Sequence, residues 1–329
     1  MKEALWYKSL EDRTVFCQLC PHGCRIKDGD AGKCRIRRNV DGVLYAATYE
    51  QVSSVAMDPI EKKPLYHFYP GSNILSIGSI GCNFSCSFCQ NWQISQDTVP
   101  LNELKVADAV KMCKERNSMG IAYTYNEPLI WLEYVMDTAR ALKEEGLRNV
   151  LVTNGYVTPK PLEQLLPYID AMNIDIKSIR DEFYKSLCGG RLKPVLDTAT
   201  KAKKYVHVEV TNLIIPGHND SEAELKELAK WIAENLGPET PTHLSAYFPR
   251  YQLKAAPTPE KTLEDAYDIF SAELHFVYLG NVAAGVGNDT KCINCGEVLV
   301  KRHGYFVEVL GIDREGMCNH CQGRSYIVC

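Results

Sequence analysis

The chain has 329 residues, a formal net charge of −4 and a pI near 6.1, so it lacks the basic character of most nucleic-acid-binding proteins. With 45% hydrophobic and 24% charged residues, it has the composition of a globular protein with one large domain and appendages, or with two domains. No apolar run approaches the roughly 18 residues of a membrane span, and the N-terminus lacks a secretory signal. We therefore expect a cytoplasmic protein, and the composition argues against membrane and nucleic-acid partners.

Eleven of the 14 cysteines fall into three tight groups, which in a large chain without a signal peptide indicates metal ligation rather than disulfides. The first group lies in a module expected over residues 1–40 and has the pattern C-x2-C-P-x2-C-x9-C, formed by Cys17, Cys20, Cys24 and Cys34. Four thiolates make a closed site, which holds either tetrahedral zinc or a [4Fe–4S] cluster without an open iron. The sequence leaves both open, and we prefer zinc.

Prolines and a glycine punctuate residues 41–72, which we expect to form an extended connecting segment. The second cysteine group follows an apolar run over 73–80 and has the spacing C-x3-C-x2-C, formed by Cys82, Cys86 and Cys89. Because a [4Fe–4S] cluster normally takes four thiolates, three would leave one iron free to bind another ligand. The alternative is a zinc knuckle completed by a histidine or cysteine from elsewhere in the chain.

Strand and helix patterns alternate through residues 73–280, which predicts an α/β fold with a parallel sheet and outer helices. The expected strands are Ile74–Ile80, Ile121–Tyr125, Val150–Thr153, Ala171–Ile176, Val206–Ile215 and His243–Tyr247. The expected helices lie near Leu104–Asn117, Leu129–Glu145, Pro161–Leu166, Pro194–Lys204, Ser221–Asn235 and Thr262–Ser271. Six such units fit a partial (β/α)6 barrel, in which functional side chains gather at the carboxyl ends of the strands.

Polar residues stand at those predicted strand ends. Asp175 and Lys177 alternate along one strand, so their side chains share a face and either pair with each other or bind a ligand. A buried charge needs a partner, and a zwitterionic ligand offers both signs. The candidate cofactor-binding residues are Phe88, Tyr125, Asn126, Glu127, Thr153, Asn154, Asp175, Lys177, Thr211 and His243.

The third cysteine group lies in a tail over residues 281–329, whose first ten residues are expected to be a flexible lead-in. Two C-x2-C pairs, Cys292 with Cys295 and Cys318 with Cys321, flank a stretch with strand character. This spacing is typical of a zinc ribbon or a rubredoxin-like site, and we expect zinc.

The segment from Cys82 to Cys89, with its aromatic Phe88, resembles the cluster loop of radical S-adenosylmethionine (SAM) enzymes. Thr153-Asn154-Gly155, Asp175-x-Lys177 and the Pro-Gly exit at 216–217 are similar to glycyl-radical-enzyme activating proteins such as pyruvate formate-lyase activase. Those proteins carry an Asp of a cation site where this chain has Val152. The N-terminal cysteines, the segment Asp58-Pro-Ile-Glu-Lys-Lys-Pro-Leu-Tyr-His-Phe68 and the cysteine tail together look like the AmmeMemoRadiSam family.

The resemblance implies an enzyme that cleaves SAM reductively at a [4Fe–4S] cluster held by Cys82, Cys86 and Cys89 as the catalytic residues. Tyr125-Asn126-Glu127-Pro128 occupies the place of the family's Gly-Gly-Glu-Pro segment, so Glu127 would meet the ammonium of SAM and Lys177 its carboxylate. The implied partners are an electron donor such as flavodoxin or ferredoxin and a substrate that is either a protein or a small molecule. The competing hypotheses are a non-enzymatic metal-binding adaptor and an electron-transfer protein.

Overall fold

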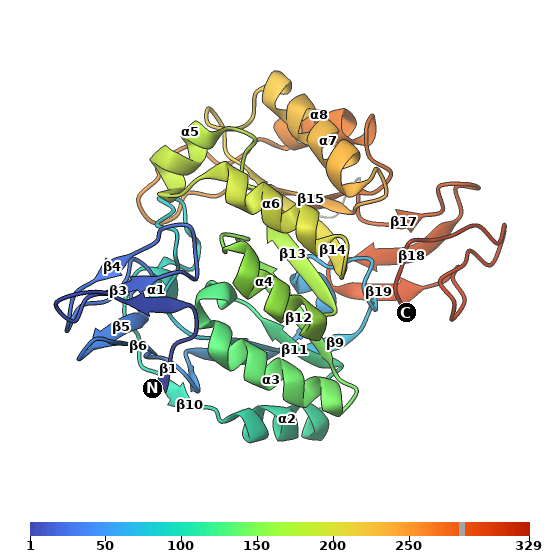
Figure 1. Cartoon of the computed structure of the whole chain (residues 1–329). Coiled ribbons are helices and arrows are strands. Elements are labelled where there is room, and N and C mark those ends of the chain that lie inside the picture. The colour runs from blue at the N-terminus through green and yellow to red at the C-terminus, as the bar shows by residue number, and fades with distance from the viewer. Residues whose placement is uncertain (283–286) are drawn as a thin grey trace.

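The computed structural model describes residues 1–282 and 287–329, and an eight-stranded sheet forms its centre (Figure 1). The six expected strands are confirmed as parallel neighbours: β9 (Asn73–Gly78), β11 (Gly120–Tyr123), β12 (Arg148–Thr153), β13 (Ala171–Asp175), β14 (His207–Ile214) and β15 (Thr242–Ala246). Two further strands extend the sheet, parallel β16 (Val277–Gly280) after β15 and antiparallel β8 (Ser54–Pro59) beside β9. The sheet thus follows the expected barrel plan with one more parallel strand and an antiparallel edge.

The expected helices are also present and cover the outer face of the sheet (Figure 1): α2 (Val106–Glu115), α3 (Leu132–Glu144), α4 (Pro159–Leu165), α6 (Leu192–Ala202), α7 (Glu222–Leu236) and α8 (Glu260–Ser271). Local sequence explains where they begin. Before α7, the side chain of Ser221 accepts a hydrogen bond from the Glu224 amide, the first half of a capping box. Ahead of α3, the Glu127 side chain caps the short 3₁₀ helix η2 (Pro128–Trp131) in the same way, which places a carboxylate at a strand end.

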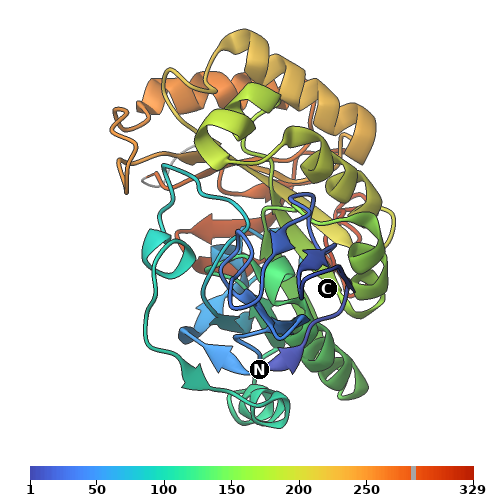
Figure 2. The ribbon, with the colours of Figure 1, turned by 60° about the vertical axis from the view of Figure 1, so that its left-hand side comes forward.

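The N-terminal residues form two small three-stranded sheets at the same end of the barrel as the short helix α1 (Trp92–Ser95), which follows the cluster loop (Figure 1). In Figure 2, where this end comes forward, these strands lie in front of the parallel strands. Lys33 donates to the Gly189 carbonyl at 2.6 Å, and Arg35 donates to the Ser95 carbonyl. The strands are β1 (Lys2–Glu3), β6 (Val43–Ala46) and β5 (Arg37–Val40), and β2 (Tyr7–Ser9), β3 (Val15–Cys17) and β4 (Arg25–Ile26); β7 (Gln51–Val52) pairs with β10 (Asn102–Glu103).

The C-terminal tail forms a three-stranded antiparallel ribbon of β17 (Thr290–Lys291), β18 (Val298–His303) and β19 (Phe306–Val309) at the opposite end of the sheet (Figure 1). Arg302 attaches the ribbon to the rest of the chain, because its guanidinium donates to the Tyr66 carbonyl at 2.6 Å. Within the ribbon, the same guanidinium donates to the hydroxyl of Thr290 at 2.7 Å. Of the lead-in expected over 281–290, residues 283–286 lie outside the described part of the chain.

A buried polar network fills the amino-terminal end of the barrel. The carboxylate of Glu209, on β14, accepts hydrogen bonds from the backbone amides of Tyr66 and His67 and from the rings of His207 and His243. Burial opposes ionisation, but these two imidazoles hold the pKa of Glu209 well below its usual value. Through these hydrogen bonds, segment 63–72 covers the amino-terminal end of the barrel.

His67 in this network gives a pH prediction. Burial lowers its pKa from 6.5 to about 3, so the unfolded chain binds a proton that the folded chain does not between these values. Stability is therefore lost as the pH falls through that window, by up to about 1.4 kcal/mol per pH unit for this one residue. We expect His67→Gln to flatten the fall in the free energy of unfolding between pH 6.5 and 4, measured by urea denaturation. An unchanged slope relative to the wild type would contradict the burial of a neutral His67.

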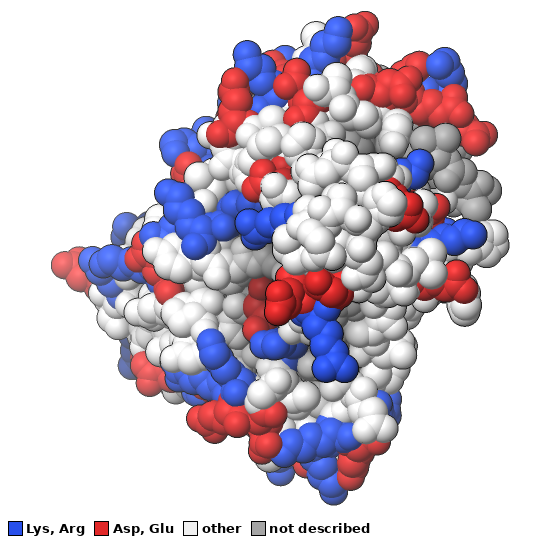
Figure 3. All heavy atoms as spheres, turned by 90° about the vertical axis from the view of Figure 1, so that its right-hand side faces the viewer, with Lys and Arg blue, Asp and Glu red and all other residues white. Residues whose placement is uncertain are grey.

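Charges of both signs are interspersed over the face shown in Figure 3, in keeping with the composition. No helix in residues 1–282 and 287–329 is both long and apolar enough to cross a bilayer.

Candidate active site

A cavity of about 330 Å³ opens at the carboxyl ends of the parallel strands, where the fold class places ligand sites. The three cysteines of the cluster loop line one side of it. Nine of the ten predicted cofactor-binding residues line it as well: Phe88, Tyr125, Asn126, Glu127, Thr153, Asn154, Asp175, Lys177 and Thr211. The loop and the strand ends therefore meet around one space.

His243 is the exception, and its prediction as a cofactor contact is corrected. It is 3% exposed and bonds Glu209 at 2.6 Å, in the network below the cavity. On β15 it precedes Ser245, which does line the cavity. Both side chains face the barrel interior, but Ser245 lies nearer the carboxyl end of the strand than His243. Alternation along a strand predicts which face a side chain points to, and does not predict how far along the barrel axis it lies.

Asn126 fastens the cluster loop to the sheet. Its side-chain oxygen accepts from the Ser79 amide at 2.9 Å, and its amide nitrogen donates to the carbonyls of Ile80 at 3.0 Å and Gly81 at 3.2 Å. Gly81 has φ +86°, and a Cβ there would stand 2.5 Å from the Cys34 carbonyl oxygen, so only glycine fits. The Asn154 side chain supports the loop from below by donating to Asn83 Oδ1 at 2.9 Å.

Glu127 is the buried carboxylate of the cavity. It accepts hydrogen bonds from the Leu129 amide at 2.9 Å, the Thr153 hydroxyl at 2.6 Å and the Asn154 amide at 2.8 Å. Burial raises its pKa to about 7 despite these donors. A cation placed beside it would stabilise the ionised form, so the position suits the ammonium of an amino acid.

Asp175 and Lys177 form the charge pair across the cavity, with Nζ 2.9 Å from Oδ2. Although burial opposes it, the negative charge of Asp175 holds the pKa of Lys177 well above its usual value. The ammonium also lies 5.9 Å from the centre of the Phe88 ring. Two carboxylates, Glu127 and Asp175, and the ammonium of Lys177 thus border the same space, so both charged ends of an amino-acid zwitterion find an opposite charge there.

Tyr125 holds a left-handed backbone conformation, φ +73°, where the resembled family has glycine. Its ring is fixed from the connecting segment, because the hydroxyl donates to Asp58 at 2.6 Å and the Lys63 ammonium lies 4.8 Å from the ring centre. Lys63 also pairs with Asp58 at 2.7 Å in a buried contact. Asp58 and Lys63 were not predicted as site residues, because a pairing with Tyr125 across so many residues leaves no local pattern in the sequence.

Cys188 also lies against the cluster loop. It is fully buried, and its carbonyl accepts the Ser85 amide at 2.8 Å. At the following Gly190, a Cβ would stand 2.2 Å from the Phe84 ring. The Cys-Gly-Gly sequence is the signal that could have placed this turn against another backbone.

The distances between sulfur atoms distinguish the C-terminal cysteine group from the other two groups. In the tail, Cys292 and Cys321 lie 3.6 Å apart and Cys295 and Cys318 3.7 Å apart, close to the edge of a zinc tetrahedron, about 3.8 Å for Zn–S bonds of about 2.3 Å. Among residues 1–282 and 287–329, these four are the only set of three or more His, Cys, Asp or Glu ligand atoms that all lie within 4.8 Å of one another. The three cluster-loop sulfurs do not all lie within that distance of one another, so they are not arranged for a single zinc ion.

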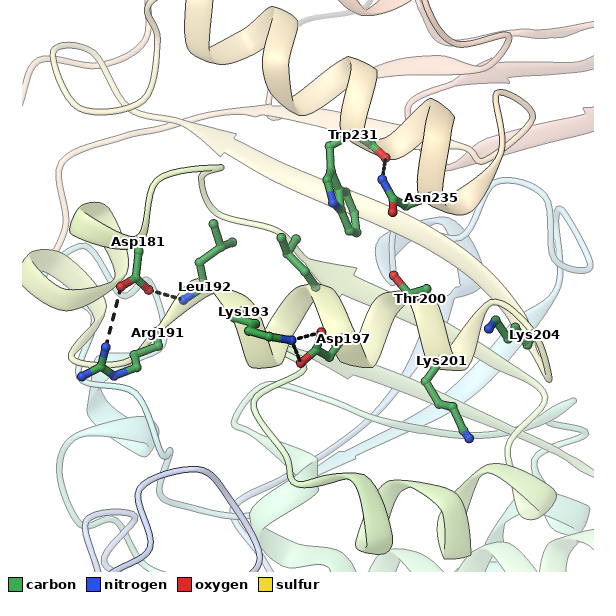
Figure 4. Close-up of a pocket in the computed structure, with 11 residues that line it drawn as sticks. Asp181, Arg191, Leu192, Lys193, Asp197, Thr200, Lys201, Lys204, Trp231 and Asn235 are labelled. Carbon is green, nitrogen blue, oxygen red and sulfur yellow. Dashed lines mark hydrogen bonds and ion pairs between the residues drawn. The ribbon is translucent and has the colours of Figure 1, made fainter.

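A larger hollow of about 720 Å³ lies outside the barrel, between α6 and α7 (Figure 4). Its charged groups largely pair with each other or with neighbours: Lys193 with Asp197 at 2.7 Å and Lys201 with Glu163 at 2.9 Å. It contains neither a thiol nor a buried charge without a partner. We therefore place the active site in the smaller cavity.

Comparison with known proteins agrees with this placement. Residues 76–232 match the Radical SAM superfamily. The uncharacterized protein MJ0808 of Methanocaldococcus jannaschii is 44% identical over 335 residues, which cover all of both chains. The pyruvate formate-lyase 1-activating enzyme of Escherichia coli is 29% identical over 163 residues, which cover 47% of this chain and 66% of that enzyme.

A solved structure shows the same fold. A radical SAM methyltransferase from Sphaerobacter thermophilus superposes with a TM-score of 0.51 at 18% identity, over 67% of this chain and 71% of that chain. The matched residues contain the cluster loop and the strand ends around the cavity, and their donor set fits both a three-thiolate cluster and a zwitterionic ligand. Residues 76–232 form a radical SAM domain, and the chain as a whole belongs to one family with MJ0808.

Proposed function

We propose that this protein is an enzyme that cleaves SAM reductively and uses the resulting radical to abstract a hydrogen atom from a substrate. The supporting observation is the shared cavity, which the three thiols of the cluster loop line together with Glu127 and the Asp175–Lys177 pair. When bound, the cluster supplies the electron that breaks the sulfonium C–S bond of SAM. The chain's own residues orient SAM through its two charges and exclude water from the enclosed space.

The proposed site assignment follows from these contacts. Cys82, Cys86 and Cys89 would hold the cluster, Glu127 would accept from the ammonium, and Lys177 would donate to the carboxylate. Asn126, Thr153 and Asn154 act as positioning residues, because their side chains bind the loop or Glu127. Val152 lines the cavity where activating enzymes of the resembled kind carry an Asp, so we propose no cation site there.

We propose a protein substrate whose backbone glycine loses the hydrogen atom, since named activating enzymes are among the relatives. The C-terminal ribbon lies at the end of the sheet away from the short helix α1 that follows the cluster loop (Figure 1). Co-incubation with a deuterated candidate protein and SAM under reducing conditions should place deuterium in 5′-deoxyadenosine. Deuterium transfer only from small molecules would overturn the protein-substrate proposal while leaving SAM cleavage intact.

The remaining proposals concern the protein's family, its location, its C-terminal metal and its electron donor. We propose that the chain belongs to the AmmeMemoRadiSam family, because it combines the N-terminal cysteines, the motif over residues 58–68 and the C-terminal cysteines. We also propose a cytoplasmic location, zinc in the C-terminal site, and reduction by a flavodoxin or ferredoxin. Metal analysis of the purified protein tests the zinc proposal.

Lys177 gives a direct test of SAM orientation. Lys177→Met removes the cation but keeps the length of the side chain, so SAM affinity should fall roughly tenfold, the loss of one charge-assisted hydrogen bond. Isothermal titration with the iron-loaded protein measures the dissociation constant. The exposed Lys193→Met is the matched control, because Lys193 pairs with Asp197 outside the barrel. Equal affinities for the wild type and Lys177→Met would exclude a carboxylate contact at this residue.

A further inference from the structure

We infer that Cys17, Cys20, Cys24 and Cys34 hold a second [4Fe–4S] cluster rather than zinc. This assignment reverses the preference drawn from the sequence, where four thiolates fitted either occupant. It does not depend on SAM cleavage, since it concerns a closed site with its own four ligands. Three observations support it: the spacing of the sulfur atoms, an unpaired buried guanidinium beside them, and the packing of the module.

The first observation is the spacing of the sulfurs. The chain contains its own reference for zinc, the C-terminal four cysteines, whose sulfurs all lie within 4.8 Å of one another. In the described part of the chain, no three of the N-terminal sulfurs meet that limit, and neither do the three of the cluster loop. A cubane binds each thiolate at a separate corner iron, so its ligands stand further apart than those of a single zinc ion. The N-terminal set therefore matches the cluster loop and not the zinc-sized tail.

The four thiols nevertheless surround one space. Cys17 and Cys20 each interact electrostatically with other cysteines of the set, so the four sulfurs are neighbours. Backbone amides already point at the sulfurs: that of Lys33 donates to Cys24 at 3.5 Å, and those of Ile36 and Arg37 face Cys34. Four neighbouring thiols with backbone donors already directed at them suit a metal centre that binds them as thiolates.

The second observation is Arg37, whose side chain is 1% exposed. Its Nη2 donates to Glu133 at 2.6 Å, but its Nε and Nη1 have no hydrogen-bond partner although both are buried. The charges of Cys17 and Cys34 act on this guanidinium, so the free donors lie beside the sulfur set without reaching it. A zinc ion adds no acceptor to its four thiolates, whereas a cubane adds inorganic sulfides. Thiolates accept hydrogen bonds in both kinds of site, but the sulfides of a cubane give these two buried donors additional acceptors.

The third observation is how the module packs. The Cys34 carbonyl touches the backbone at Gly81, one residue before Cys82, and His22 bonds the Asn83 carbonyl at 2.7 Å. Cys17 and Cys34 belong to the same hydrophobic core as Cys86. Of the C-terminal cysteines, Cys292 and Cys318 instead belong to a small separate core. The N-terminal site is thus a buried neighbour of the SAM-cleaving centre, and the zinc-sized site is separate from it.

The test uses a variant of the full chain in which Cys82, Cys86 and Cys89 are all alanine, reconstituted anaerobically with iron and sulfide. We expect about four irons and four sulfides per chain to remain, with zinc at about one. The wild type should carry about eight irons. A triple variant with no iron and about two zinc ions per chain would overturn the proposal. The variant should not cleave SAM in either case, so this outcome is independent of the proposed function.

Two further variants guard against misfolding and chance binding. Cys295→Ser/Cys321→Ser should lose zinc and keep all of the iron, because both residues are exposed and lie outside the main core. Arg37→Lys keeps the charge but removes the two free donors, so the N-terminal cluster should stay bound with a lower midpoint potential in an EPR redox titration of the triple-alanine background. An unchanged potential would show that Arg37 does not contact the cluster.

Discussion

Cys86→Ala is expected to reduce the yield of 5′-deoxyadenosine from SAM to background, a loss of more than about 100-fold. Cys86 lines the cavity and is one of only three thiols in the cluster loop, so its loss leaves two thiolates for a cubane. The measurement is product analysis after anaerobic reconstitution, with dithionite as the reductant. Zinc in the tail should stay at the wild-type level.

Cys113→Ala is the matched control for this experiment. Cys113 is also fully buried, but it lies on α2 with its thiol 3.4 Å from the Gly120 carbonyl and does not line the cavity. Its replacement should leave the product yield unchanged. Continued SAM cleavage by Cys86→Ala, with iron still bound, would contradict the three-thiolate assignment.

Glu127→Gln is expected to weaken SAM binding roughly 10- to 100-fold, the equivalent of about 1.5–3 kcal/mol for a lost hydrogen bond to a charged group. Glu127 is the only buried carboxylic acid among the described residues that line the cavity, and the partly exposed Asp175 already pairs with Lys177. Its amide replacement keeps the shape and removes the charge that would hold the ammonium. Titration of SAM into the iron-loaded variant gives the affinity.

Glu224→Gln provides the comparison, because Glu224 is likewise buried and accepts from the Ser178 hydroxyl at 2.5 Å, but does not line the cavity. It should bind SAM as the wild type does. Iron content must match in all three proteins, since Glu127 also supports Asn154, which lies under the loop. A Glu127→Gln variant with full iron and wild-type SAM affinity would remove Glu127 from the binding site.

Much of the barrel was predictable because its strands are short apolar runs that alternate with amphipathic helices. The structure adds β8 and β16, which carry weaker signals: β8 contains the polar residues Ser54 and Asp58, and β16 spans only Val277–Gly280. Their pairing is decided by neighbours elsewhere in the chain, and an edge strand need not be apolar on both faces.

The candidate site was predictable where a short motif carries it, as at Cys82-x3-Cys86-x2-Cys89 and at Thr153-Asn154. It was not predictable where distant segments meet. His243 was expected in the cavity, but the carboxylate of Glu209 holds it below, and Tyr125 is fixed by Asp58 from the connecting segment. Spacing alone also left the N-terminal metal open, since only the positions of the sulfurs and Arg37 distinguish the two occupants.

The most direct test of SAM cleavage at a three-thiolate cluster is the EPR spectrum of the reduced triple-cysteine centre with and without SAM, recorded with product analysis on the same sample. The account predicts a cluster signal that changes when SAM binds, followed by 5′-deoxyadenosine when the reduced sample turns over. A protein that contains only zinc, or an iron–sulfur signal that is identical with and without SAM, would contradict it.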